Sequence, residues 1–214
     1  MKDCQLFGRR VLTGRSPDLH EETMKSYLFL DIDGVLNHSR SPTSRKLFEI
    51  DPEPVVQLNR IVESTRPEIV ISSTWRINHD TAAMAAKLVE KGFWFPELVV
   101  GATASIYGGS VPSIPLPESR MRRGVEIIHW LETHAQLPYG MVILDDETSM
   151  WVIGDRLVKT NMSTGGLKAR HVEPAIQMLQ TPLTELPDSA VARLVHDPFV
   201  DHEGGPQAIK ENDE

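Results

Sequence analysis

The stretch Tyr27-Leu28-Phe29-Leu30-Asp31-Ile32-Asp33-Gly34 decides the fold prediction, because an apolar run leads directly into two carboxylates and a glycine. A continuous apolar run of this length is typical of a strand buried on both faces of a sheet. Side chains alternate along an extended backbone, so Asp31 and Asp33 are expected to point the same way. Gly34 permits a sharp turn that exposes nearby backbone amides. The stretch therefore predicts a buried strand that ends in a polar loop.

Two later segments repeat this arrangement of an apolar strand followed by polar groups. Residues 68–71 lead into Ser72-Ser73-Thr74-Trp75-Arg76, and residues 141–144 lead into Asp145-Asp146. Further strands are predicted at 98–100 and 157–160, and helices at 54–64, 80–91, 122–134 and 173–179. Strands that alternate with helices predict an α/β fold, a Rossmann-like three-layer sandwich around a central parallel sheet. Polar groups that end its strands are expected to meet at one edge of the sheet.

Composition sets the predicted domain organisation and compartment. The chain has 214 residues, 40% of them hydrophobic, which suits one domain over 25–180 between an N-terminal extension, 1–24, and an acidic tail, 181–214. Cys4 is the single cysteine, so no internal disulfide argues for an oxidising compartment. No apolar run is long enough to cross a bilayer, and the formal charge of −8 disfavours unspecific attraction to nucleic acid. A cytoplasmic protein is predicted.

The acidic pairs predict a metal-dependent chemistry. Asp31 and Asp33 would repel each other at close range, and a divalent cation relieves that repulsion. Oxygen-only ligands, completed by Asp145 and Asp146, suit Mg²⁺ better than zinc. With the cation neutralising phosphate charge, one carboxylate is able to attack phosphorus while the other protonates the leaving oxygen. We therefore predict a Mg²⁺-dependent phosphohydrolase.

The same motifs resemble those of a known superfamily. Residues 28–37, Leu-Phe-Leu-Asp-Ile-Asp-Gly-Val-Leu-Asn, resemble the first motif of the haloacid dehalogenase (HAD) superfamily. Residues 70–74 resemble the second motif and residues 143–146 the fourth. The Ser-Thr-Trp-Arg segment at 73–76 is most similar to small HAD proteins that include the HAD domain of bacterial RNA-repair proteins. The likeness covers about residues 26–180 and extends to the Gly-Leu segment at 160–167.

The resemblance implies a role for each acidic residue. Asp31 would be the nucleophile that forms a transient aspartyl-phosphate. Asp33 would be the general acid and base, and would also touch Mg²⁺ through its main-chain carbonyl. Asp145 would coordinate the metal, with Asp146 helping directly or through water.

Other motif positions are assigned to phosphate and substrate. Ser73, or its neighbour Ser72, would hold a phosphoryl oxygen, with Ser73 preferred. Gly34 and Thr74 are placed on the substrate side, and Arg76 is assigned either to substrate phosphate or to a salt bridge.

The third motif departs from the superfamily pattern, which has a lysine at this point. Arg123 stands there and keeps the charge, but its planar fork of donors differs from a lysine's point charge. The sequence leaves three substitutes open for this cation: Arg120, Arg122 and Lys159.

Substrate size and rival functions complete the predictions. Neither gap between motifs clearly holds a separate cap domain, so an open site is expected, with nucleotides or phosphorylated nucleic-acid ends as the leading substrates. The alternatives are a non-catalytic HAD-fold binding or regulatory protein, and a phosphotransferase. The tryptophans are interpreted as core residues rather than substrate platforms: Trp75, Trp94, Trp130 and Trp151.

Overall fold

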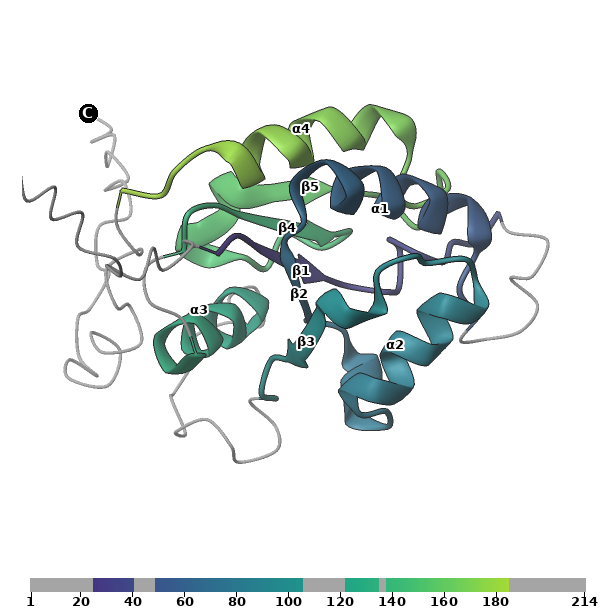
Figure 1. The fold of residues 1–214 in the computed structure, drawn as a ribbon, viewed down its shortest axis with the longest axis horizontal. Helices are drawn as coiled ribbons and strands as arrows, with labels where there is room; N and C mark the ends of the chain where they lie inside the picture. The colour runs from purple at the N-terminus through teal and green to yellow at the C-terminus, as the bar shows by residue number, and fades with distance from the viewer. Residues whose placement is uncertain (1–24, 41–48, 106–121, 135–137, 185–214) are drawn as a thin grey trace, which may run out of the picture.

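The structure, a computed structural model, describes residues 25–40, 49–105, 122–134 and 138–184, and the side chains of 151 and 152 are not described. Five parallel strands form one sheet in the order β3-β2-β1-β4-β5 (Figure 1). This confirms the predicted α/β fold with a central parallel sheet. The strands are β1 (Tyr27–Leu30), β2 (Glu68–Ile71), β3 (Val99–Ala102), β4 (Met141–Asp145) and β5 (Leu157–Lys159).

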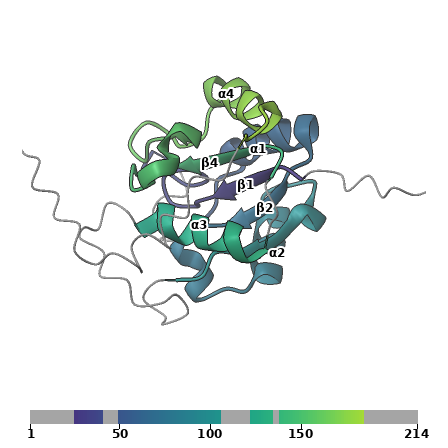
Figure 2. The same ribbon diagram turned by 90° about the vertical axis from the view of Figure 1, so that its left-hand side faces the viewer.

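Helices cover both faces of this sheet. They are α1 (Pro52–Thr65), α2 (Thr81–Glu90), α3 (Arg122–His134) and α4 (Ala169–Gln180), with short 3₁₀ segments η1 (Thr74–Ile77), η2 (Pro96–Leu98) and η5 (Trp151–Arg156). Figures 1 and 2 show α1 and α4 together on one side of the sheet and α3 on the other. None of the helices in the described ranges is both long and apolar enough to span a bilayer.

Several predictions concern residues outside the described ranges. The predicted extension 1–24, Arg120 and most of the predicted tail lie there, as do residues 107–118, whose Gly, Pro and Ser content predicts a loop. The domain limits and the absence of a cap therefore stay predictions.

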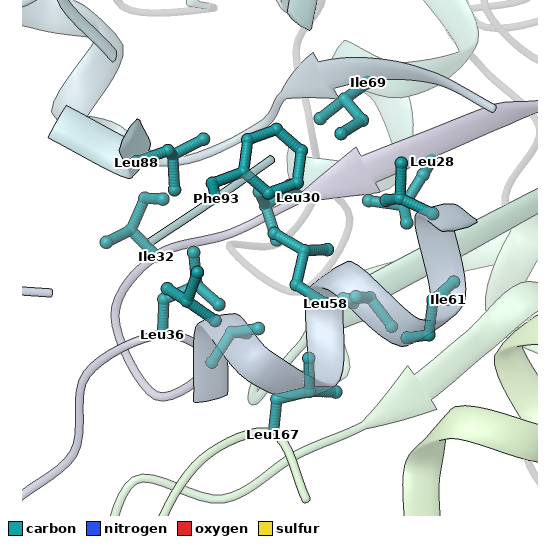
Figure 3. Packing of buried hydrophobic residues seen from close by; sticks show 14 of the residues in the cluster. Leu28, Leu30, Ile32, Leu36, Leu58, Ile61, Ile69, Leu88, Phe93 and Leu167 are labelled. Carbon is teal, nitrogen blue, oxygen red and sulfur yellow. The ribbon is translucent and has the colours of Figure 1, made fainter. Parts of the chain in front are cut away.

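Alternation along the strands sorts the core into two clusters. Leu28 and Leu30 of β1 pack with side chains of α1, α2 and α4, and Figure 3 shows Leu58 of α1 and Leu88 of α2 in this cluster. The intervening Phe29 faces α3 instead and joins the second cluster. Each fully buried Leu or Phe contributes about 1.5–3 kcal/mol, so both layers are strongly held.

The same alternation and register place a row of polar residues at the end of the sheet. Leu30 is aligned with Ile71 and with Leu144. The residues that directly follow these three therefore lie next to one another in one further row across the sheet, and the Asp31 N–H still donates to Leu144 O at 3.0 Å. In this row Asp145 of β4 is aligned with Lys159 of β5. The row faces α3, because its residues lie two positions beyond strand side chains that pack on that helix.

Element ends differ from prediction at α4. The sequence predicted a start at 173, but the helix begins at Ala169 and includes Pro174. The ring of His171 accepts a hydrogen bond from the Lys168 N–H at 3.0 Å, which caps the earlier start. Asp80, the first residue of the predicted helix 80–91, caps α2, since its carboxylate accepts from the Ala83 N–H at 2.7 Å.

The tryptophan prediction is partly wrong. Trp75 and Trp130 are buried as expected, but the Trp94 side chain is 62% exposed. Trp94 lies between the end of α2 at Glu90 and η2, in the segment that leads into the edge strand β3. The Trp151 side chain lies outside the described part of the structure.

Candidate functional site

Three aspartates converge at the carboxyl ends of the two central strands. One carboxylate oxygen from each of Asp31, Asp145 and Asp146 lies within 4.8 Å of the other two. Asp31 follows β1, and Asp145 ends the neighbouring β4. This is where the chain reverses direction across the sheet, since β2 and β3 lie on one side of β1 and β4 and β5 on the other. Open α/β sheets bind ligands at such a point.

Burial makes this cluster resist ionisation. Burial raises the pKa of Asp31 to about 6, although the nearby Arg123 charge and a hydrogen bond from Ser73 oppose the change. Burial also raises the pKa of Asp145 to about 7, and repulsion from Asp31 adds to it. The pKa of Asp146 is raised too, again mainly by burial. The protein alone therefore supplies too little positive charge to offset burial and keep the pKa values of these carboxyl groups at their ordinary level.

Arg123 of α3 is the cation that reaches into the cluster. Its Nε lies 3.2 Å from Asp145 Oδ2, and its Nη2 lies 3.6 Å from Asp31 Oδ2. The guanidinium fork thus contacts both central strands at once. Of the alternatives left open by the sequence, Arg122 and Lys159 line the adjoining cavity instead.

The donor atoms of the cluster fit a hard divalent cation. They are all carboxylate oxygens, which Mg²⁺ prefers. Asp145 Oδ1 accepts the Glu147 N–H at 2.8 Å, while the buried Oδ2 accepts no hydrogen bond from the described residues. The neighbour of this oxygen is the Arg123 Nε at 3.2 Å, so its hydrogen-bonding capacity is left for a ligand such as a metal ion.

Gly34 keeps the space beside Asp146 open. Its φ of +74° lies in the left-handed region, and a Cβ added there would come within 2.2 Å of the Asp146 carboxyl group. The Gly34 carbonyl accepts the Thr160 hydroxyl at 2.7 Å, so the turn is tied to the segment after β5. A side chain at this position would displace the third acidic group of the cluster.

Asp33 lies apart from the three-carboxylate cluster. Its Oδ1 accepts from Asn37 Nδ2 at 2.7 Å, and its Oδ2 accepts from Trp75 Nε1 at 3.0 Å. The side chain is partly exposed. Its carboxylate is therefore held by two N–H donors rather than by the metal cluster, while its main-chain carbonyl remains the predicted metal contact.

The two serines of the second motif have different partners. The Ser73 hydroxyl hydrogen-bonds Asp31, and it also accepts the Trp75 N–H at 3.4 Å. The Ser72 hydroxyl is buried and makes no hydrogen bond with the described residues. Contact with Asp31 thus distinguishes Ser73 from its neighbour.

Arg76 adopts the salt-bridge role of the two that the sequence left open. Its Nη2 donates to Glu126 of α3 at 2.6 Å, and both side chains are only 7% exposed. Its Nη1 donates to the carbonyls of Ser72 and Ser73 at 3.1 and 2.6 Å. Burial lowers the pKa of Arg76, and the Glu126 charge opposes this change. The pair clamps the second-motif backbone against α3.

A cavity of about 530 Å³ adjoins the cluster on the α3 side. Thr74 and Arg76 line it, as do Asp146 and Arg123 from the site itself. Arg122 and Lys159 add positive charge to its wall, and Glu147 adds negative charge. The cavity gives a ligand access to the acidic cluster.

A comparison with protein families matches residues 27–172 to the HAD domain in Swiss Army Knife RNA repair proteins. The chain belongs to this family. The match covers more than half of the chain, including all five strands and the acidic cluster. Comparisons with curated proteins and with solved structures gave no match.

Four contacts in this HAD domain were missed by sequence reasoning. Trp75 and Asn37 bind Asp33, Glu126 pairs with Arg76, and Thr160 binds the Gly34 carbonyl. Asn37 was visible as part of the quoted first motif, four residues after Asp33. The other partners lie far apart along the chain, and only the folded sheet brings them together.

Proposed function

We propose that the protein is a Mg²⁺-dependent phosphohydrolase that acts on a phosphomonoester through an aspartyl-phosphate at Asp31. The observation that carries this proposal is the convergence of Asp31, Asp145 and Asp146 under the Arg123 guanidinium. Membership of the HAD family supports a phosphohydrolase.

The chemistry divides into two balanced steps. Bound Mg²⁺ would neutralise negative charge on the carboxylates and on the substrate phosphate. A carboxylate oxygen of Asp31 attacks phosphorus, the bond from phosphorus to the leaving oxygen breaks, and Asp33 gives that oxygen a proton. Asp33 then takes a proton from the water that attacks the aspartyl-phosphate, which releases phosphate and restores Asp31. Arg123 holds Asp31 and Asp145 in place and offsets their charge throughout.

Phosphorylated nucleic-acid ends or nucleotides are the substrate class that we propose. Lys159 is aligned with Asp145 one strand away, and it lines the same cavity as Arg122. Two cations there suit a substrate with a second negative group beyond the phosphate that is cleaved. The family description, which names RNA repair proteins, supports the same class.

A phosphatase panel tests both levels of the proposal. Nucleotides, oligonucleotides phosphorylated at either end and sugar phosphates are assayed for phosphate release with Mg²⁺ and with EDTA. Turnover that needs Mg²⁺ and is lost in Asp31→Asn supports the phosphohydrolase. Absence of turnover would favour a non-catalytic binding protein, and transfer of phosphate to added alcohols would favour a phosphotransferase.

The substrate class has its own control. Lys159→Gln is expected to raise KM for the preferred oligonucleotide more than for a small aryl phosphate. Lys87→Gln removes a similar charge from α2, at a position that does not line the cavity, and should change neither. Turnover of sugar phosphates alone would refute the nucleic-acid class and leave the phosphohydrolase standing.

A further inference from the structure

The carboxylate of Asp33 has a hydrogen-bond donor on each oxygen, and the two donors differ in kind. Asn37 belongs to the same turn as Asp33 and is partly exposed, whereas Trp75 lies 42 residues away in η1 and is 4% exposed. We propose that Trp75 is a positioning residue that fixes Asp33 for proton transfer to the leaving group. This inference rests on the proposed function, in which Asp33 is the general acid and base.

The Trp75 indole is held rigidly where it meets Asp33. Its backbone N–H donates to Ser73 Oγ at 3.4 Å, and its carbonyl oxygen accepts the His79 N–H at 3.1 Å. The ring is buried beside β2, so rotation about its two side-chain torsions is blocked by packing. The Nε1–H therefore points in one direction, and Asp33 Oδ2 lies on it at 3.0 Å.

These contacts assign different duties to the two oxygens of Asp33. An indole N–H is a donor only, so it favours an unprotonated Oδ2. Asn37 donates to Oδ1 at 2.7 Å, but its own Oδ1 also accepts the Gly34 N–H at 3.1 Å, and Asn37 is partly exposed. A substrate oxygen is able to replace Asn37 at Oδ1 without disturbing the buried ring. Asp33 Oδ1 is then the atom that carries the proton.

The test compares two leaving groups of similar size on the full chain with Mg²⁺. Phenyl phosphate releases a basic oxygen that needs a proton, whereas para-nitrophenyl phosphate releases a stable anion that does not. The value of kcat/KM reports the steps up to loss of the leaving group. Trp75→Phe is expected to lower kcat/KM for phenyl phosphate about tenfold or more. It should change kcat/KM for para-nitrophenyl phosphate by no more than about twofold.

Trp130→Phe is the matched control, because it removes the same atoms from a tryptophan that is 6% exposed. Trp130 packs edge-on against Tyr27 and Phe29 in the other core cluster. Trp130→Phe should change kcat/KM for both substrates by the same factor. A second variant replaces Trp75 by benzothienylalanine, in which sulfur stands in place of the N–H and the shape of the ring is kept. This variant should repeat the selective loss with no change in the unfolding midpoint.

The outcomes separate the inference from the function on which it rests. If Trp75→Phe and the sulfur analogue lower kcat/KM for both substrates equally, or leave both values unchanged, the positioning role of Trp75 is refuted while the proposed phosphohydrolase function stands. In an Asp33→Asn background, the loss from Trp75→Phe should disappear, because the group that it positions is gone. Wild-type protein that turns over neither aryl phosphate nor any substrate of the phosphatase panel would overturn the proposed function, and the inference with it.

Discussion

Replacing the nucleophile should stabilise the metal-free protein while it abolishes turnover. Asp31 is buried at the carboxyl end of β1, beside β4, with its side chain 6% exposed, and its ionised form is disfavoured there. Asp31→Asn keeps the shape and the acceptor for the Ile32 N–H, which Asp31 Oδ1 now binds at 2.8 Å. It removes the charge. The variant is therefore expected to unfold less readily than wild type whenever no divalent cation is present.

The raised pKa of Asp31 sets the size of this effect. The pKa rises from an ordinary 3.8 to about 6, because burial outweighs the attraction of Arg123. At about 1.4 kcal/mol for each unit of pKa, full ionisation of Asp31 costs the folded state up to about 3 kcal/mol above pH 6. Arg123 also pairs with Asp145, so when the Asp31 charge is removed the Arg123 charge stabilises Asp145 alone. We expect a gain of about 1–3 kcal/mol in the free energy of unfolding.

Urea unfolding at pH 7.5 in EDTA and in excess Mg²⁺ provides the assay. In EDTA, Asp31→Asn should have the higher free energy of unfolding. In Mg²⁺ the difference between the two proteins should shrink or change sign, because the bound cation stabilises wild type more than the variant. Asp155→Asn is the matched control, since it makes the same chemical change on a side chain that is 70% exposed. A variant that is less stable than wild type in EDTA would refute the electrostatic argument.

The remaining predictions concern pH, the glycine turn and the buried ion pair. In EDTA the free energy of unfolding should fall as pH rises from about 4 to 8, because two buried carboxyl groups have pKa values raised from 3.8 to about 6 and 7. Bound Mg²⁺ should remove most of this pH dependence, and a free energy of unfolding that rises with pH in EDTA would contradict the reasoning. Gly34→Ala should weaken Mg²⁺ binding measured by calorimetry, because the added Cβ would collide with Asp146. Gly92→Ala is the control: Gly92 also has a positive φ, but no atom lies within 4 Å of a Cβ added there, so this variant should lower stability without changing Mg²⁺ binding. In urea unfolding, Arg76→Leu and Glu126→Leu should each lower the free energy of unfolding by about 3–5 kcal/mol, because each leaves a buried charge without its partner. The double variant should lose less than the sum of the two single losses, and additive losses would rule out direct coupling of the pair.

Local pattern was enough to predict the strands and the residues that end them. The apolar runs before Asp31 and Asp145 predicted β1 and β4, and parallel pairing brings their carboxyl ends together. Local pattern was not enough to choose between Ser72 and Ser73, because both hydroxyls follow the same strand. Their difference arises from which one meets Asp31 after β2 pairs with β1.

Contacts that depend on distant segments were beyond the reach of the sequence. The Asp33 carboxylate was predicted to be the general acid and base, but the sequence did not show that its hydrogen bonds come from Asn37 and from Trp75 beyond the second strand. Burial of Trp75 was predicted correctly, whereas the direction of its N–H depends on the turn between β2 and η1. The same limit applies to Glu126, whose partner Arg76 lies 50 residues away.

The placement of the site follows from the placement of the core. Phe29 packs on the α3 side of the sheet, and Leu28 and Leu30 pack on the other side. Because side chains alternate, a slip of one residue in the pairing of β1 would turn Asp31 away from Arg123 and expose the apolar face that now packs on α1. The burial energy of both layers therefore opposes the displacement that would separate the carboxylates from their cation. Stability of the core and geometry of the acidic cluster are one property of the β1 register.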